Sequence, residues 1–233
     1  MPETALQNRT QTTQTVAPDV AGDAARRSQL AGLTYAQQAA AVAPGSAGAS
    51  KPALGSGDQA FQEMWDAHPH NYQDDASQNT SSDEVREEHG LPAYLANTCA
   101  IRLSVMLNKI GQKITPASVK AAGITRAPTY SKKTKEYYIV AASEMWQYLT
   151  KHFRKSDVVF PQKGTYKTEA EFQEAYDSTI RPLVQGKKGI VAFQKIFGYG
   201  GTGHVDLFDG ETLSDAGNWY PSTRIELWYI SVP

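Results

Sequence analysis

The sequence is short of cysteine, of net charge and of long apolar runs. Its single cysteine, Cys99, excludes an intramolecular disulfide framework and a multi-cysteine zinc site. The 23 basic and 24 acidic residues leave a net charge of −1, so no basic field indicates nucleic acid or an anionic membrane as a partner. No apolar run approaches the length needed to cross a bilayer, which predicts that the chain inserts in no membrane.

A secretory signal is also missing, because the N-terminus has no basic start followed by an apolar core. We therefore expect synthesis as a soluble cytoplasmic protein, and action elsewhere would need another means of export. Aromatic residues are scarce at this end, where Tyr35 is the only one among the first 60 positions. Residues 1–57 cannot bury enough apolar area to offset about 1–2 kcal/mol of backbone entropy per residue. The sequence predicts a flexible leader over 1–57 and a folded domain over 58–233.

One short helix is expected inside the leader. Thr34 can cap a helix that runs to Ala43 and that Pro44 stops. Its apolar surface is small, so two interpretations stay open. It is either a transient helix in a linker or a docking peptide for a carrier or loading partner.

The rest of the chain changes from helical to strand periodicity. Asp58 is expected to cap a first helix, and a polar loop from His68 to about Gly90 follows. Further helices are predicted over 100–110, 115–123, 144–153 and 168–184, and strands over 189–196, 204–208 and 224–230. Helices first and an antiparallel sheet last predict an α+β domain.

Cys99 lies at the start of the helix expected over 100–110, directly after the cap residues Asn97 and Thr98. The free N–H groups and the positive dipole end of a helix start favour an anion, and the thiolate is the nucleophilic form of cysteine. A lone cysteine is more often a buried small hydrophobe, but such a residue would lie in the apolar stripe of the helix. The position therefore favours a catalytic thiol.

A cysteine nucleophile needs a base and a group that orients the base. Of the five histidines, only His204 opens a strand, directly after the glycine-rich turn 198–203. Its alternative is a solvent-exposed residue at a strand end. Asp206 points to the same strand face, and Asp215 is placed to reach the histidine from a neighbouring strand, although either aspartate can be an ordinary strand or turn residue.

Metal sites are not expected. His68 and His70 have no third ligand nearby in the sequence, and the same holds for a pair of His204 with Asp206. The sequence therefore predicts no metal and no cofactor.

Two extended motifs surround the candidate catalytic residues. Residues 97–104 read Asn-Thr-Cys-Ala-Ile-Arg-Leu-Ser and are followed by Leu107-Asn108-Lys109 and Gly111, and residues 203–210 read Gly-His-Val-Asp-Leu-Phe-Asp-Gly. Together with the closing segment 225–230, they resemble the cysteine and histidine motifs of the fourth family of type VI secretion amidase effectors. The likeness covers about residues 59–233 and implies a papain-like fold of the NlpC/P60 class.

This resemblance implies a toxin that hydrolyses the γ-D-glutamyl–meso-diaminopimelate bond of peptidoglycan stem peptides in the periplasm of a rival bacterium. Cys99 matches the family's nucleophile and His204 its base. The family's third member, an aspartate soon after the histidine, matches Asp215 best. Asp206 remains the alternative, because the segment between is not a clean match. The family also implies a cognate immunity protein that blocks the active site.

Asp206 and Arg102 are further candidates for substrate binding, Arg102 through a substrate carboxylate, although a surface role for Arg102 fits equally. Two other functions stay open. One is a cysteine transpeptidase or acyltransferase on the same scaffold, and the other is a non-catalytic cargo or interaction protein whose working part is the leader.

The leader separates this chain from compact members of the family. Its segment 32–38 resembles a short motif near the start of some proteins of extracellular contractile injection systems. The delivery route, type VI or extracellular, therefore stays open. In either case we expect a component of a contractile injection machine to bind the leader.

Overall fold

The computed structural model describes residues 51–70, 80–210, 212–214 and 219–233. By its internal contacts the chain divides into two compact units, Met1–Ala49 and Ser50–Pro233. The first unit, with the helix predicted over 34–43 and the motif at 32–38, lies outside the described residues. Within the second, Leu54 is buried and the Gly57 amide donates to the Ile230 carbonyl at 2.7 Å, so the fold takes in residues ahead of the first described helix.

Helices build the first half of the second unit. In chain order they are α2 (Asp58–Ala67), α3 (Ser82–Glu88), α4 (Cys99–Lys109), α5 (Pro116–Ala121) and α6 (Ala142–Tyr148), which continues as the π-helical turn η1 (Leu149–Phe153). A hairpin of β1 (Thr129–Tyr130) and β2 (Tyr137–Tyr138) lies between α5 and α6. The helices predicted over 100–110, 115–123 and 144–153 are confirmed within two residues at each end. None of the helices described is long and apolar enough to cross a membrane.

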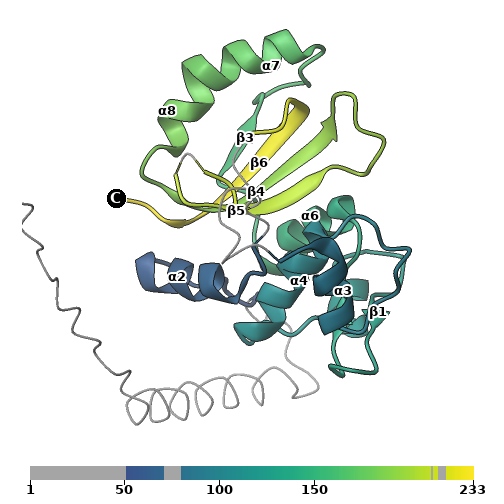
Figure 1. Ribbon diagram of the computed structural model, residues 1–233. Coiled ribbons are helices and arrows are strands. Elements are labelled where there is room, and N and C mark those ends of the chain that lie inside the picture. The colour runs from purple at the N-terminus through teal and green to yellow at the C-terminus, as the bar shows by residue number, and fades with distance from the viewer. Residues whose placement is uncertain (1–50, 71–79, 211, 215–218) are drawn as a thin grey trace, which may run out of the picture. The chain divides into compact units, whose positions relative to one another are not determined.

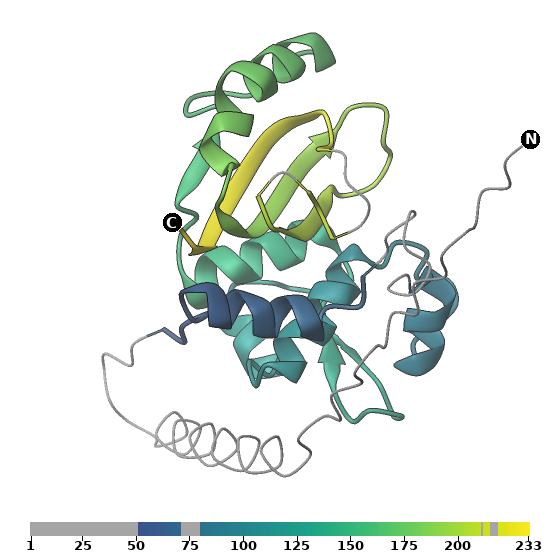
Figure 2. The ribbon, with the colours of Figure 1, turned by 60° about the vertical axis from the view of Figure 1, so that its left-hand side comes forward.

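The second half supplies an antiparallel sheet. After β3 (Val158–Phe160) come the helical segments α7 (Glu169–Ala175), η2 (Tyr176–Ile180) and α8 (Arg181–Val184), then β4 (Lys188–Ile196), β5 (His204–Phe208) and β6 (Ser222–Ser231). The strand order is β3-β6-β4-β5, and every neighbouring pair is antiparallel. In both ribbon views α2, α4 and α6 lie on one side of this sheet and α7 and α8 on the other (Figure 1, Figure 2). The predicted α+β class is confirmed.

Both faces of the sheet are buried, which explains the apolar runs in its strands. On β4, Ile190 and Ala192 pack in the cluster that includes α2, α4 and α6, whereas Val191 and Phe193 pack in the opposite cluster. Alternate strand residues point to opposite faces, so a strand covered on both sides is apolar throughout. β5 is an edge strand and packs against α4, and this contact builds the candidate site.

The prediction of a polar loop from His68 to about Gly90 is wrong in its second half, because that half contains α3. This helix starts with a capping box, in which Ser81 accepts from the Glu84 amide at 3.2 Å and Glu84 accepts from the Ser81 amide at 2.7 Å. Val85 is the one buried apolar residue of this helix, so no apolar periodicity marks it in the sequence.

The cap predicted for the first helix is also wrong. Gly57 occupies the N-cap position of α2, and Asp58 is its first helical residue. The Asp58 carboxylate instead accepts from the Ser231 hydroxyl at 2.8 Å and from the Lys188 ammonium at 3.2 Å. These contacts from β4 and β6 lower the pKa of Asp58, with the Ser231 hydroxyl as the largest cause.

Candidate active site

Cys99 is the first residue of α4 and is partly exposed. Every following residue from Ala100 to Asn108 is buried, because the sheet, α2, α6 and the hairpin surround this helix. The first-turn N–H groups of a helix have no partner within it, and with the dipole they favour an anion. The thiol therefore lies at the end of the helix where these N–H groups are free of helical partners.

Thr98 holds the N-cap position, as predicted, but its hydroxyl makes no capping bond to the helix backbone. It accepts from the Arg102 Nε at 3.1 Å and lies 2.9 Å from the Ser82 hydroxyl of α3. The hydroxyl thus connects the start of α4 to the start of α3 and leaves the backbone N–H groups of the first turn without a bond from it.

The position of His204 depends on the preceding residue, Gly203. No other residue can replace this glycine without a shift of the backbone. Gly203 has a φ of +114°, and a Cβ there would lie 2.2 Å from the Phe193 carbonyl oxygen. The glycine lets the turn close against β4, so that β5 begins at His204, paired with Phe193. The imidazole lies 4.8 Å from the Tyr220 ring and 6.1 Å from the Phe193 ring, measured between centroids. These rings limit how the imidazole can turn.

A cavity of about 140 Å³ joins the start of α4 to the start of β5. Cys99 and His204 both line it, so the structure brings together the pair predicted from the sequence. The other lining residues are His68, Ser82, Ala96, Asn97, Thr98, Arg102, Tyr199, Val205 and Asp206. Both predicted substrate-binding residues, Asp206 and Arg102, are among them.

Tyr199 is a lining residue that the sequence did not single out, except as part of the glycine-rich turn. Its ring lies against Gly201, where a Cβ would be 2.3 Å from a ring carbon. Burial raises the pKa of Tyr199, the Cys99 thiolate raises this pKa further, and His204 lowers it. The phenol is therefore electrostatically coupled to both residues, and its raised pKa keeps it protonated as a hydrogen-bond donor.

Asp206 is buried beside His204, with an exposed fraction of 1%. Its Oδ2 lies 3.4 Å from the His204 Nε2. Its Oδ1 accepts from the Leu207 amide at 2.7 Å and from the Ser214 hydroxyl, and it lies 3.8 Å from the His68 Nε2. Asp206, the alternative orienting group, is thus in contact with the imidazole, whereas Asp215 lies outside the described residues.

Arg102 is 3% exposed and donates four hydrogen bonds to other described residues. Besides the Thr98 hydroxyl, its acceptors are the carbonyl oxygens of Pro69 at 2.6 Å, His70 at 3.0 Å and Thr80 at 2.6 Å. A surface position for Arg102 is excluded. Its guanidinium connects α4 to the segment after α2 and to the segment before α3.

Within the described ranges, no group of three or more His, Cys, Asp and Glu side chains could hold a metal ion. His68 and His70 are both buried, with ring centroids 5.5 Å apart. Burial lowers the pKa of His70, whose Nε2 lies 2.7 Å from the Trp65 carbonyl oxygen.

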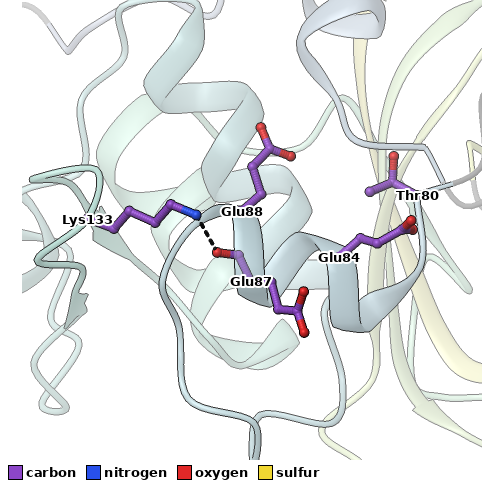
Figure 3. Close-up of a pocket in the computed structure, with 5 residues that line it drawn as sticks. All are labelled: Thr80, Glu84, Glu87, Glu88 and Lys133. Carbon is purple, nitrogen blue, oxygen red and sulfur yellow. Dashed lines mark hydrogen bonds between the residues drawn. The ribbon is translucent and has the colours of Figure 1, made fainter.

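A larger hollow of about 440 Å³ lies elsewhere, between α3 and Lys133 of the β1–β2 connection (Figure 3). Three glutamates of α3, Glu84, Glu87 and Glu88, line it, and Lys133 donates to the Glu87 carbonyl at 2.8 Å. Among the described residues, neither a cysteine nor a histidine lines it. The smaller cavity, with Cys99 and His204, is therefore the candidate active site.

Comparisons with known proteins agree with this choice. The family model of the type VI secretion system amidase effector protein 4 (Tae4) matches residues 95–228, a segment that contains Cys99 and His204. None of the curated proteins matches the chain.

Several solved structures of this kind are similar to the chain. A Salmonella typhimurium effector–immunity system, Tae4 with Tai4, is 26% identical over 73% of this chain and 97% of that chain, with a TM-score of 0.47. The Enterobacter cloacae Tae4 effector is 21% identical over 78% and 99%, with a TM-score of 0.47. The Salmonella typhimurium effector in complex with the Enterobacter cloacae immunity protein is 24% identical over 73% and 98%, with a TM-score of 0.49.

Proposed function

The chain belongs to the family of type VI secretion system amidase effector protein 4, whose model matches more than half of it, and we propose how its residues perform amide hydrolysis in peptidoglycan. Cys99 is the nucleophile, and His204 is the general base and then the general acid. The observation that carries this assignment is the cavity that both residues line, inside the segment that matches the family. Neither a metal nor a cofactor takes part in the proposed steps.

The reaction has two stages. The Cys99 thiolate attacks the carbonyl carbon of the γ-D-glutamyl–meso-diaminopimelate bond, and the backbone N–H of Cys99 donates to the oxyanion that forms. His204, protonated when the thiolate forms, gives its proton to the leaving diaminopimelate amine, and the glutamyl group stays on sulfur as a thioester. His204 then takes a proton from water, which attacks the thioester and releases the glutamyl carboxylate. That proton returns to the thiol.

Two aspartates are proposed to act on the His204 imidazole. Asp215 matches the family's third catalytic position and is the proposed orienting residue. Asp206, whose Oδ2 lies 3.4 Å from the His204 Nε2, is the second, and its negative charge favours the imidazolium that forms during the reaction. With Nε2 held by a carboxylate, the other ring nitrogen of His204 is the one that exchanges protons with Cys99.

Arg102 is proposed to hold the site together and not to bind a substrate carboxylate. Its guanidinium already donates to the Thr98 hydroxyl and to three backbone carbonyls. Releasing these acceptors for a ligand would leave buried or partly buried carbonyl groups without donors, which is costly. The Tyr199 phenol and the start of α4, which both line the cavity, are better placed to contact the substrate.

The biological setting is proposed from the family. Solved structures of the Salmonella typhimurium and Enterobacter cloacae effectors contain an immunity protein, Tai4, and we propose that a cognate immunity protein binds this chain over its cleft. The effector would act on peptidoglycan stem peptides in the periplasm of a target cell. The part of its leader that precedes the folded unit, residues 1–49, would bind a component of a contractile injection machine, of type VI or extracellular kind.

The assignment is tested by digesting purified sacculi with the wild type and with Cys99→Ala. The wild type should release soluble muropeptides and the variant none, while Tyr94→Phe, which alters a side chain that is 80% exposed and lies outside the cavity lining, should behave as wild type. Digestion by Cys99→Ala at the wild-type rate would exclude cysteine catalysis. Products with an exchanged amine in place of a free carboxylate would identify a transpeptidase.

The role of the leader is tested by deletion of residues 1–49, which retains Leu54 in the core and the Gly57 contact with β6. The shortened chain should digest sacculi like the full chain and should not be delivered into target cells. Unchanged delivery would exclude a loading role for the deleted residues.

A further inference from the structure

A second histidine borders the cavity and has no part in the reaction described above. His68 is the C-cap residue of α2 and is 4% exposed. Its Nδ1 lies 3.3 Å from the Ser214 Oγ, and its Nε2 lies 3.8 Å from the Asp206 Oδ1. The Ser214 hydroxyl in turn contacts the same Asp206 oxygen. His68, Ser214, Asp206 and His204 thus form one connected line of polar groups.

The direction of these hydrogen bonds follows from the chemistry of the groups. An ionised carboxylate only accepts, so Ser214 gives its single proton to Asp206. The Ser214 oxygen can then only accept from His68, which requires the proton of this ring to be on Nδ1. On the other side of the carboxylate, the His204 Nε2–H donates to the Asp206 Oδ2. Both histidines therefore donate toward Asp206, His204 directly and His68 through the Ser214 hydroxyl.

We propose that His68 is a positioning residue of the amidase reaction, which holds the Asp206 carboxylate toward His204 through the Ser214 hydroxyl. This inference rests on the proposed function of Cys99 and His204. With Oδ1 fixed by Ser214 and by the Leu207 amide, Oδ2 is left to face the imidazole. A fixed carboxylate keeps one tautomer and one orientation of His204, which a turning carboxylate does not.

The backbone around His68 is held in place on both sides. Arg102 donates to the carbonyl oxygens of Pro69 and His70, directly after His68. The His70 ring lies 4.6 Å from the Trp65 ring, and its Nε2 lies 2.7 Å from the Trp65 carbonyl oxygen. These contacts, from α4 and from α2 itself, hold the His68 side chain against β5. Among the described residues, the ionisable groups near this segment include His70, Arg102 and Asp66, besides Asp206 and His204.

Two substitutions separate the hydrogen bond from the packing. His68→Leu fills the space without a donor, and His68→Asn places an amide N–H where the His68 Nδ1–H is. With a soluble stem-peptide substrate, kcat of His68→Leu should fall about tenfold to hundredfold, the effect of losing support for one hydrogen bond to a charged group, with KM unchanged. His68→Asn should recover most of this loss. The matched control is His152→Leu, since His152 is stacked on Tyr148 outside the cavity, and its kcat should equal the wild-type value.

A double-mutant cycle tests whether His68 acts through Asp206. If it does, His68→Leu combined with Asp206→Asn should lose little more activity than Asp206→Asn alone. Losses that add fully would contradict the proposal, and so would a wild-type kcat in His68→Leu. An equal loss in His68→Leu and His68→Asn would assign His68 to packing and overturn the proposal as well. If His68→Leu does not fold, Ser214→Ala takes its place in the cycle, with the same expected results.

A measurement without substrate separates this inference from the proposed function. Cys99 is the only cysteine, so iodoacetamide alkylates a single site, at a rate that reports the reactivity of the thiolate. At one neutral pH, His68→Leu should be alkylated several-fold more slowly than wild type, and His68→Asn nearly as fast. A wild type that digests no peptidoglycan but shows this pattern would refute the amidase assignment and support the positioning role. Equal alkylation rates in all three proteins would refute the positioning role.

Discussion

The Cys99 thiol, at the first residue of α4, and the His204 imidazole, at the first residue of β5, line one cavity. Each lies at the start of its element for a physical reason. At the start of α4 the first-turn backbone N–H groups have no partner within the helix, and the steric demand at Gly203 fixes where β5 begins. At the residue scale, the proposed reactivity of Cys99 and His204 therefore depends on backbone geometry, and on the Asp206 carboxylate beside the imidazole.

The two aspartates should differ in their effect on turnover. Asp215→Asn should lower kcat by about a thousandfold or more, as loss of an orienting carboxylate does in a catalytic triad. Asp206→Asn keeps the shape and removes the charge 3.4 Å from His204, and we expect a smaller loss, about tenfold to hundredfold. Steady-state kinetics on a stem peptide measures both. If Asp206→Asn loses more than Asp215→Asn, then Asp206 is the main orienting residue.

Tyr199→Phe should lower kcat/KM by about threefold to tenfold, because the phenol is a protonated donor coupled to Cys99 and His204. The ring, which packs against Gly201, is retained, so the loss would belong to the hydroxyl. Tyr94→Phe is the matched control, since Tyr94 lies outside the cavity lining. Equal kcat/KM in both variants would show that the Tyr199 hydroxyl does not contact the reacting groups.

At the scale of elements, the sequence predicts those helices and strands whose apolar residues recur with a clear period. The stripe Leu103, Met106 and Leu107 identifies α4, and the apolar run of β4 identifies a strand buried on both faces. The helix α3 cannot be predicted in this way, because Val85 is its one apolar residue. Ser81 and Glu84 nevertheless form a capping pattern that can be recognised in the sequence.

The roles of Arg102 and His68 could not be predicted in the same way. Both depend on partners that are distant in the sequence. Arg102 depends on the carbonyl groups of Pro69, His70 and Thr80, and His68 depends on Ser214 and Asp206. Periodicity assigns a residue to a helix face or a loop, and it does not say which loop folds over that face. The positions of Cys99 and His204, at the start of a helix and of a strand, could be predicted because each lies next to a local signal, a pair of cap residues and a glycine turn.

The connection that Arg102 makes between elements should be important for stability. Arg102→Met removes the donor to the carbonyls of Pro69, His70 and Thr80, and the free energy of unfolding should fall by about 3 kcal/mol or more. Arg126→Met, which breaks the exposed pair with Glu144, should cost less than about 1 kcal/mol. Urea unfolding measures both values. Equal small losses would mean that the Arg102 contacts contribute little.

At the scale of the whole molecule, burial of histidines couples stability to pH. Burial lowers the pKa values of His70, His89 and His152 below the ordinary value of 6.5. As the pH falls through 6.5, the unfolded chain takes up protons before the folded chain does, so the free energy of unfolding falls. Above this pH both states are neutral at these positions and their contribution is constant.

His89→Asn should therefore reduce the loss of stability between about pH 7 and about pH 5. His89 is a suitable choice because its Nδ1 lies 3.0 Å from the Tyr138 hydroxyl, outside the cavity lining, and an asparagine can keep this contact. Thermal unfolding at a series of pH values gives the slope for both proteins. Identical slopes would contradict the assignment of a lowered pKa to His89.

The chain combines this folded unit with residues 1–49, so hydrolysis and delivery can be tested separately. Hydrolysis of peptidoglycan by Cys99 is the central claim. Its most direct test is mass spectrometry of sacculi digested in water labelled with a heavy oxygen isotope. The wild type should release fragments with a free diaminopimelate amine and one labelled oxygen in the new glutamyl carboxylate, and Cys99→Ala should release none. Labelled fragments from Cys99→Ala, or cleavage at another bond, would contradict the account.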